Sequence, residues 1–331
     1  MKKTFQKTLI AAAAGAALMS AVGTANANSL LFPYFTTATG AQSVLSLSNT
    51  SAITQGLHYV YNYCTACTHF DANGSLTSND ILSHSIAQPA GFSTTGVALP
   101  GAPGAGGFGK VVPTDTSVPV YFPLANQQGF LVVSTTGGTL GVSATINGLQ
   151  GSMAIVDPAT GLVVSYAGIS NGVQTILNTN EGNFAAFNDV NFALATMPAA
   201  IVSTSWYAVV LGDMQATITA GADWTARATF TNNGFVYNND EFPISGTVTK
   251  AITCAGPLLA TDLMTGAQAA AIGTNGGLIK TTAALSTGAV ASASGVVLMK
   301  MQTVQAAVGA PFAGRQFLHR ESAANVTAAI P

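Results

Sequence analysis

Short runs of β-branched and aromatic residues recur along the chain between positions held by Gly, Asn, Asp and Pro. This pattern is typical of antiparallel strands joined by turns. In the run from Leu57 to Tyr63, leucine and tyrosine alternate with His58, Val60 and Asn62, which predicts a half-buried strand. Further strands are predicted at Ser43 to Ser48, Gly129 to Ser134, Leu162 to Tyr166, Ser205 to Leu211, Trp224 to Thr231 and Gly246 to Cys254.

Asparagine and glycine mark the expected turns, because both tolerate the positive φ of tight hairpins. These positions are Asn49-Thr50-Ser51, Asn73-Gly74, Asn147-Gly148, Asn171-Gly172 and Asn232-Asn233-Gly234. Helix is expected from about Thr261 to Ile272, with Thr261 as the cap and Gly273 as the stop, and a second helix from Asn183 to Ala195. The pattern therefore predicts an all-β fold of antiparallel β-sandwich modules with one or two short helices.

Residues 1–27 have the parts of a secretory signal peptide. A basic segment from Met1 to Lys7 precedes an alanine-rich apolar run from Thr8 to Val22, and Ala25-Asn26-Ala27 is a small-x-small cleavage site. The apolar run is shorter than the roughly 20 residues that a spanning helix needs. We therefore expect cleavage after Ala27 and secretion to the periplasm or outer surface of a Gram-negative bacterium.

The rest of the chain is too long for a single sandwich of about 100 residues. Two domains are predicted, an N-terminal β-sandwich domain over 28–180 and a C-terminal β-rich domain over 181–331. The segment between Lys280 and Lys300 is apolar enough to suggest a membrane helix, but Ser, Thr and Gly interrupt it. Strands and turns are the expected structure there.

Charge is scarce, since 7% of the residues are charged against about 25% in an ordinary globular domain. Without the three lysines of the signal segment, seven basic groups stand against twelve acidic ones. A nucleic-acid-binding protein needs a basic patch to neutralise phosphates, so this class is excluded. Intrinsic disorder is excluded too, because hydrophobic residues make up 48% of the chain.

The cysteines are Cys64, Cys67 and Cys254. In an oxidising compartment, Cys64 and Cys67 are predicted to close a small local disulfide. Cys254 is then left over: it is buried and unpaired, pairs with another chain, or takes one of the other two cysteines. A c-type haem site is not expected, because Thr68 separates Cys67 from the histidine that would ligate the iron.

Two other motifs match the pattern of a metal site or a catalytic site only in part. His58, His69 and His84 lie close together in the sequence, but their spacing matches no standard metal-ligand set. Gly168-Ile169-Ser170-Asn171-Gly172 fits the G-x-S-x-G pattern of hydrolases, yet that pattern requires a strand-to-helix turn in an α/β sheet. No catalytic residue, metal or cofactor is therefore assigned, and we expect the protein not to be an enzyme.

Six segments of the first half resemble, in order and character, a group of uncharacterised secreted proteins from proteobacteria. They are Leu30-Leu31-Phe32-Pro33-Tyr34-Phe35, Ser43 to Ser51, Leu57 to Tyr63, Cys67-Thr68-His69-Phe70-Asp71, Gly129-Phe130-Leu131-Val132-Val133 and Gly151 to Gly161. The resemblance implies a secreted, β-rich protein. It implies no activity and no residue role.

The composition favours a structural protein of the cell surface: a subunit of a filament, sheath or surface layer. A surface rich in Thr, Ser, Asn, Gly and Ala, with few charges to repel neighbouring copies, suits permanent packing into a homo-oligomer or polymer, or against other cell-surface components. The apolar segment of Leu30, Leu31, Phe32, Tyr34 and Phe35 is predicted to add as a strand to a neighbouring subunit, or else to pair within its own sheet.

Two further hypotheses stay open at this point. A soluble adhesin or carbohydrate-binding module would use exposed aromatic side chains. The aromatic residues that could serve are Trp206, Trp224, Tyr59, Tyr61 and Tyr63. An outer-membrane β-barrel is the other alternative, because its short alternating strands leave a weak sequence signal.

Overall fold

The computed structural model of the protein describes residues 29–38, 41–63, 67–87, 117–135, 148–157, 162–170, 184–214, 223–286, 292–304 and 316–320. The predicted signal peptide and Cys64 lie outside the described residues. The chain splits into two compact units, one of Met1–Tyr63 with His69–Asn183 and the other of Cys64–Thr68 with Phe184–Pro331. The division after Asn183 falls close to the predicted boundary at 180, but the short segment 64–68 groups with the second unit.

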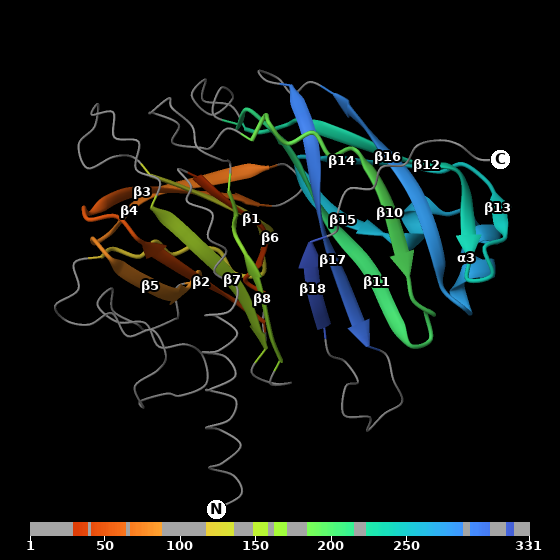
Figure 1. Ribbon diagram of the computed structural model, residues 1–331, viewed down its shortest axis with the longest axis horizontal. Coiled ribbons are helices and arrows are strands. Elements are labelled where there is room, and N and C mark those ends of the chain that lie inside the picture. The colour runs from red at the N-terminus through yellow and green to blue at the C-terminus, as the bar shows by residue number, and fades with distance from the viewer. Residues whose placement is uncertain are drawn as a thin grey trace, which may run out of the picture. The chain divides into compact units, whose positions relative to one another are not determined.

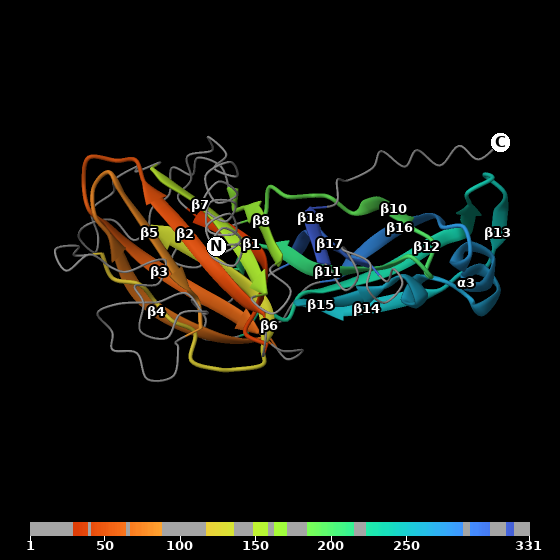
Figure 2. The ribbon, with the colours of Figure 1, turned by 90° about the horizontal axis from the view of Figure 1, so that it is seen from below.

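The first unit consists of antiparallel strands in two sheets (Figure 1). Its strands are β1 (Ser29–Thr36), β2 (Gln42–Asn49), β3 (Gln55–Tyr63), β4 (Thr68–Leu76), β5 (Asp80–Ser85), β6 (Gln128–Thr135), β7 (Leu149–Asp157), β8 (Leu162–Ala167) and β9 (Ile169–Ser170). One sheet has the order β4-β3-β6-β1-β9 and the other the order β5-β2-β7-β8. Figure 2 shows β3, β4 and β6 in one layer and β2, β5 and β7 in the other.

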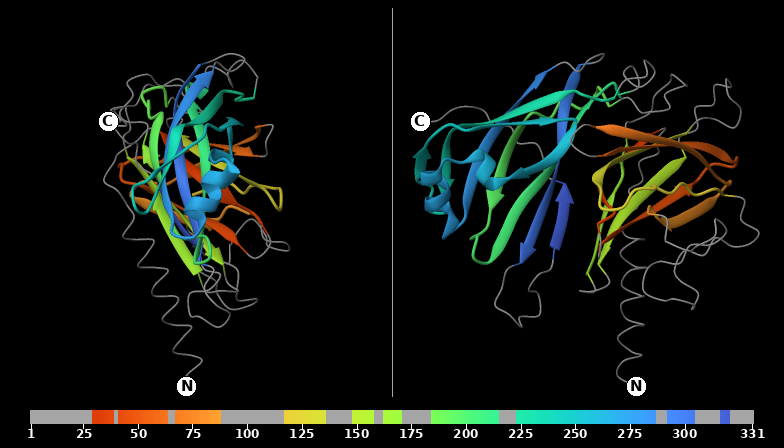
Figure 3. Two further views of the ribbon diagram at one scale, coloured as in Figure 1. Left: turned by 90° about the vertical axis from the view of Figure 1, so that its right-hand side faces the viewer. Right: turned by 180° about the vertical axis from the view of Figure 1, so that it is seen from behind.

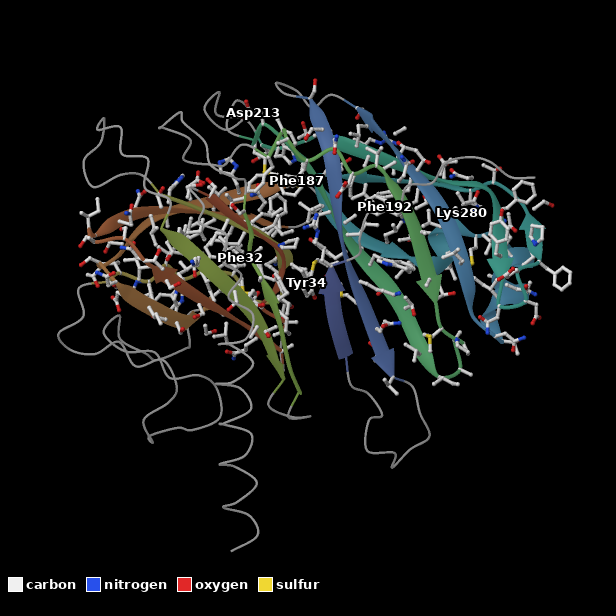
Figure 4. The ribbon with its side chains drawn as sticks, in the orientation of Figure 1. Phe32, Tyr34, Phe187, Phe192, Asp213 and Lys280 are labelled. Atoms are coloured by element: carbon white, nitrogen blue, oxygen red, sulfur yellow. A yellow bond between two sulfur atoms is a disulfide. The ribbon has the colours of Figure 1, made fainter. Side chains whose placement is uncertain are left out.

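The two sheets of the first unit pack closely where Phe32 of β1 meets β7. A Cβ atom added at Gly151 or Gly168 would come within 3.0 Å of the Phe32 ring, so glycine leaves the space that the ring occupies. Phe32 is fully buried, and Figure 4 places its side chain among the strands of the first unit. Glycine in β7 and glycine between β8 and β9 thus leave room for an aromatic side chain between the layers.

The second unit also consists of antiparallel strands in two sheets. Its strands are β10 (Asn191–Thr196), β11 (Val202–Gly212), β12 (Arg227–Asn238), β13 (Pro243–Ser245), β14 (Thr249–Thr253), β15 (Ala255–Leu259), β16 (Gly277–Ser286), β17 (Ala293–Val304) and β18 (Gln316–Arg320). One sheet runs β10-β16-β12-β13, with β14 also paired to β12, and the other runs β15-β11-β17-β18. The core between them includes Trp206, Trp224, Phe192 and Phe230, all essentially inaccessible.

A 3-10 helix, η1 (Ala260–Leu263), and a short α-helix, α3 (Gly266–Gly273), follow β15 (Figure 3). The predicted helix from Thr261 to Ile272 is therefore interrupted, and its cap is Thr265 rather than Thr261. The Thr265 hydroxyl accepts from the Gln268 N–H at 3.3 Å, and the Gln268 side chain accepts from the Thr265 N–H at 2.8 Å. This reciprocal pair is a capping box, which explains why the α-helix begins at Gly266.

The second predicted helix, from Asn183 to Ala195, is wrong. Residues 191–196 form β10, which pairs with β16 from Asn191 opposite Thr282 to Thr196 opposite Gly277. The alternation of buried Phe192 and Leu194 with less buried neighbours is the period of a strand. Sheet pairing therefore overrides the helix propensity of the alanines in this segment.

Two of the predicted Asn-Gly turns lie inside strands instead. Asn73 and Gly74 belong to β4, where a Cβ at Gly74 would come within 2.5 Å of the Val118 carbonyl oxygen. Glycine is needed there for close approach of another segment. The Asn232-Asn233-Gly234 segment is a β-bulge in β12, marked by a register shift after Asn232 and by φ of +85° at Gly234.

The prediction of an all-β, sandwich-like fold with a short helix is confirmed. The segment between Lys280 and Lys300 contributes to β16 and β17, as its interrupted apolar pattern indicated. Within the described part of the chain, no helix has the length and apolar character that crossing a bilayer requires.

Candidate functional site

A disulfide joins Cys67 to Cys254, 187 positions later in the sequence. Their Cα atoms are 6.0 Å apart, within the usual range for a disulfide. Both residues adopt a positive φ, 57° at Cys67 and 59° at Cys254, and both are buried. Each cysteine lies where the chain passes from one strand to the next, Cys67 before β4 and Cys254 between β14 and β15.

The predicted disulfide between Cys64 and Cys67 is therefore wrong, and so is an unpaired or intermolecular Cys254. The backbone explains why Cys254 is well placed for a bond. Its N–H donates to the Ala226 carbonyl and its carbonyl accepts from the Val210 N–H, both at 2.7 Å. These contacts hold Cys254 at one position in the second unit, the unit to which segment 64–68 also belongs.

The segment predicted to add to a neighbouring subunit is an internal strand. β1 pairs with β6 along Ser29–Thr36, and on its other edge Leu30 and Leu31 pair with Ser170 and Ile169 of β9. All eight residues of β1 are buried. The alternative of pairing within its own sheet is the one that the structure shows, so this segment is not a free assembly strand.

The edge of β1 beyond β9 is closed by two side-chain hydroxyls. The Tyr34 N–H donates to the Tyr166 hydroxyl at 3.3 Å, and that hydroxyl donates to the Tyr34 carbonyl. Two residues further on, the Thr36 N–H donates to Ser43 Oγ at 2.9 Å, and Ser43 Oγ donates to the Thr36 carbonyl at 3.1 Å. Each hydroxyl therefore satisfies both backbone groups that a neighbouring strand would otherwise bind.

Tyr34 needs such a partner because β9 pairs only with Leu30 and Leu31. The register between β1 and β6 shifts between Phe32 and Phe35, where Pro33 also lacks an N–H. Burial raises the pKa of the Tyr166 hydroxyl well above its ordinary value, although its hydrogen bond to Tyr34 acts in the opposite direction. The hydroxyl thus keeps the proton that it donates.

The edge of β10 is different, because no described strand pairs with it on the side away from β16. The Ala283 N–H donates to the Val190 carbonyl, and antiparallel pairs alternate between bonded and non-bonded positions. By that alternation, Asn191, Ala193 and Ala195 direct their N–H and C=O groups away from β16. β10 contains no charged residue and no proline.

Two other edge strands, β4 and β15, carry features that usually prevent such pairing, whereas β8 resembles β10 in having no charge and no proline. β4, at the edge of the first sheet, carries His69 and Asp71, whose Nε2 and Oδ2 atoms lie 3.3 Å apart. β15 has Pro257 at its centre. Charges and proline on edge strands oppose association with other chains. Ala195 of β10 is exposed and Met197, directly after the strand, is 50% exposed, so β10 is the candidate interaction edge.

The aromatic residues that would serve carbohydrate binding are core residues. Trp206, Trp224, Tyr59 and Tyr61 are 0% exposed. The Trp224 Nε1–H donates to the Val210 carbonyl at 2.8 Å, and the Tyr61 ring contacts Phe35 edge to face. Tyr63 is partly exposed, but its ring packs on Phe122. The adhesin or carbohydrate-binding hypothesis therefore loses the observation that supported it.

The remaining candidates are the histidines and the G-x-S-x-G segment. Among the described side chains, no group of three or more His, Cys, Asp and Glu comes together. His84 is fully buried, with Nδ1 2.9 Å from the Ser85 carbonyl oxygen, and its burial lowers its pKa to about 4. Ser170 ends β9 opposite Leu30, while the residues that follow it and the side chain of His319 lie outside the described structure.

No known protein family matches this chain, and no curated protein matches it in sequence. The resemblance to secreted proteobacterial proteins therefore stays a prediction from the sequence.

Proposed function

We propose that this protein is a secreted structural protein of the bacterial cell surface that assembles with copies of itself through strand β10. The observation that carries the proposal is the uncharged edge of β10, with which no strand of the described residues pairs, beside the exposed Met197. A six-residue edge strand can pair with the same strand of a second copy in antiparallel fashion about a two-fold axis. The secreted location rests on the sequence of residues 1–27.

The distribution of charge favours a second copy as the partner. β10 has no charged residue, so no like charges meet when two copies of it lie side by side. Its open side presents the backbone groups of Asn191, Ala193 and Ala195. Small alanine side chains leave room for close approach on the exposed face of the strand. A highly charged partner would find no complementary group on β10.

The test compares the assembly of the purified protein with that of two lysine variants. Ala195→Lys places a charge on the β10 edge strand, and Ala270→Lys places the same charge on an exposed position of α3. We expect electron microscopy and light scattering to show assemblies for the unmodified protein and for Ala270→Lys, and their loss or marked reduction for Ala195→Lys.

A third variant, Ala193→Pro, removes an N–H on the open side of β10 while leaving the groups that face β16. It is expected to weaken assembly as Ala195→Lys does, without adding charge. If the unmodified protein stays monodisperse and monomeric at high concentration, self-assembly is refuted. If both lysine variants assemble equally well, β10 is not the contact.

A further inference from the structure

A pocket of about 380 Å³ opens at the α3 end of the second unit. Its walls are the first residues of β11, the end of β15 with η1, one side of α3, and the connection from β10 to β11. The volume lies toward the lower end of the roughly 300–1,000 Å³ of small-molecule sites. The lining shares Thr196 and Met197 with the end of β10, but it includes neither the disulfide nor Asn191, Ala193 and Ala195.

None of the described residues that line the pocket carries a charge. Val202, Leu259, Met264 and Ile272 supply apolar surface to its walls. Met197 and Leu259 of the lining are 50% and 48% exposed, and Ile201, next to Val202 in the chain, is 53% exposed. Burying a charged group without a partner is costly, so this lining selects against ions. Clustered exposed apolar side chains favour an apolar ligand.

One polar atom in the pocket, the hydroxyl oxygen of Thr204, can orient a bound ligand. Thr204 lines the pocket, and its Oγ1 is buried with no hydrogen-bond partner among the described residues. A buried hydroxyl without a partner is unfavourable, and a ligand that supplies one hydrogen bond removes that cost. Ser203, Ser205 and Thr261 add hydroxyl groups to the walls.

The walls are held in place by hydrogen bonds before any ligand binds. On one side, Asp262 accepts from the Leu259 N–H at 2.9 Å and pairs with Lys250 Nζ at 3.2 Å, which fixes η1. On the other side, Gln268 Nε2 donates to the carbonyls of Ile244 and Gly246, each at 2.9 Å, which fixes α3.

The connection after β10 is attached to the end of α3, because the Ala199 N–H donates to the Gly273 carbonyl at 2.9 Å. The pocket is therefore bounded on three sides by segments that are tied to their neighbours. A preformed pocket loses little entropy on binding, which favours affinity for a small ligand.

We propose that this pocket binds an uncharged, mainly aliphatic small molecule whose polar end hydrogen-bonds to Thr204. Octanol and octanoate are matched probes, since they share an alkyl chain but differ in charge at neutral pH. Methyl-labelled methionine gives the readout by NMR, because Met197 and Met264 line the pocket, whereas Met153 lies in β7 of the first unit.

We expect octanol to shift the Met197 and Met264 signals saturably, to leave the Met153 signal in place, and to bind more tightly than octanoate. Ala269→Trp fills the pocket and is expected to weaken octanol binding about tenfold or more. Ala270→Trp is the matched control, because Ala270 is exposed on the same helix and does not line the pocket. An unchanged signal of Met299, which is buried in β17 and does not line the pocket, verifies that each variant keeps the fold of the second unit.

Thr204→Val keeps the shape of the side chain and removes the hydroxyl, so octanol binding is expected to weaken about fivefold. The proposal is overturned if octanol shifts neither Met197 nor Met264 saturably. It is also overturned if the two tryptophan variants bind octanol equally, or if octanoate binds as tightly as octanol. An unchanged affinity in Thr204→Val would contradict the hydrogen bond.

Discussion

The hydroxyl of Tyr166 serves Tyr34 as a neighbouring strand would, accepting from its N–H and donating to its carbonyl. The two residues are 132 positions apart in the sequence. Their contact satisfies the buried backbone groups of Tyr34 on the edge of β1 where β9 pairs only with Leu30 and Leu31. It also explains how a strand with a proline at its centre lies between β6 and β9.

Removing this hydroxyl is expected to destabilise the protein. Tyr166→Phe leaves the Tyr34 N–H and carbonyl buried without a partner, at a cost of about 1–3 kcal/mol in the free energy of unfolding. Urea titration followed by circular dichroism measures the change. An unfolding free energy equal to that of the unmodified protein would show that water or another group replaces the hydroxyl without loss.

The matched substitution at Tyr59 is expected to raise the free energy of unfolding or to leave it unchanged. The Tyr59 hydroxyl is buried and has no hydrogen-bond partner among the described residues, and burial raises its pKa. Tyr59→Phe removes a desolvated polar group while keeping the ring, so stability should be unchanged or should rise by about 1 kcal/mol. The same urea titration measures the free energy of unfolding of Tyr59→Phe. A clear loss of stability would reveal a partner of this hydroxyl.

The disulfide predicts a specific peptide map. Digestion under non-reducing conditions should yield Cys67 and Cys254 in one cross-linked species, detected by mass spectrometry. Cys254→Ser is expected to lower the free energy of unfolding by about 2–5 kcal/mol, because the bond closes a long loop and so restricts the unfolded chain. Cys64→Ser is the control and should retain both the cross-link and the stability. Recovery of Cys64 linked to Cys67 would contradict the pairing.

His84 is expected to make the protein less stable in mild acid. Burial lowers its folded pKa from 6.5 to about 4, so between these values the unfolded chain binds the proton more readily than the folded one. Stability is therefore lost as the pH falls from about 6.5 to about 4, by at most about 3 kcal/mol from this residue. Urea titrations at a series of pH values measure the slope.

Two variants test this pH dependence, one at the buried His84 and one at the partly exposed His69. His84→Phe keeps an aromatic ring beside Tyr121, whose ring centroid lies 5.3 Å from that of His84, and it should flatten the pH dependence. His69→Gln, at a partly exposed position on β4, should leave most of the slope intact. If the slope survives in His84→Phe, another group is responsible for it.

The sequence by itself determined the fold class and several of the strands. Short runs of β-branched and aromatic residues identify β3, β6 and β11. The low charge follows from composition alone. Local rules were less reliable where a neighbouring segment decides the outcome: Gly74 lies in β4 because Val118 passes close to it, and residues 191–196 form a strand because they pair with β16.

Only the tertiary structure decided which groups meet across long stretches of chain. The pairing of Cys67 with Cys254, the closure of the β1 edge by Tyr166, and the pocket around Thr204 bring together residues from separate elements. Each depends on how sheets and turns are placed in three dimensions, which periodicity and turn residues do not specify. A local pattern such as Cys-x-x-Cys favours the nearest partner, whereas the folded backbone brings a distant cysteine within bonding distance.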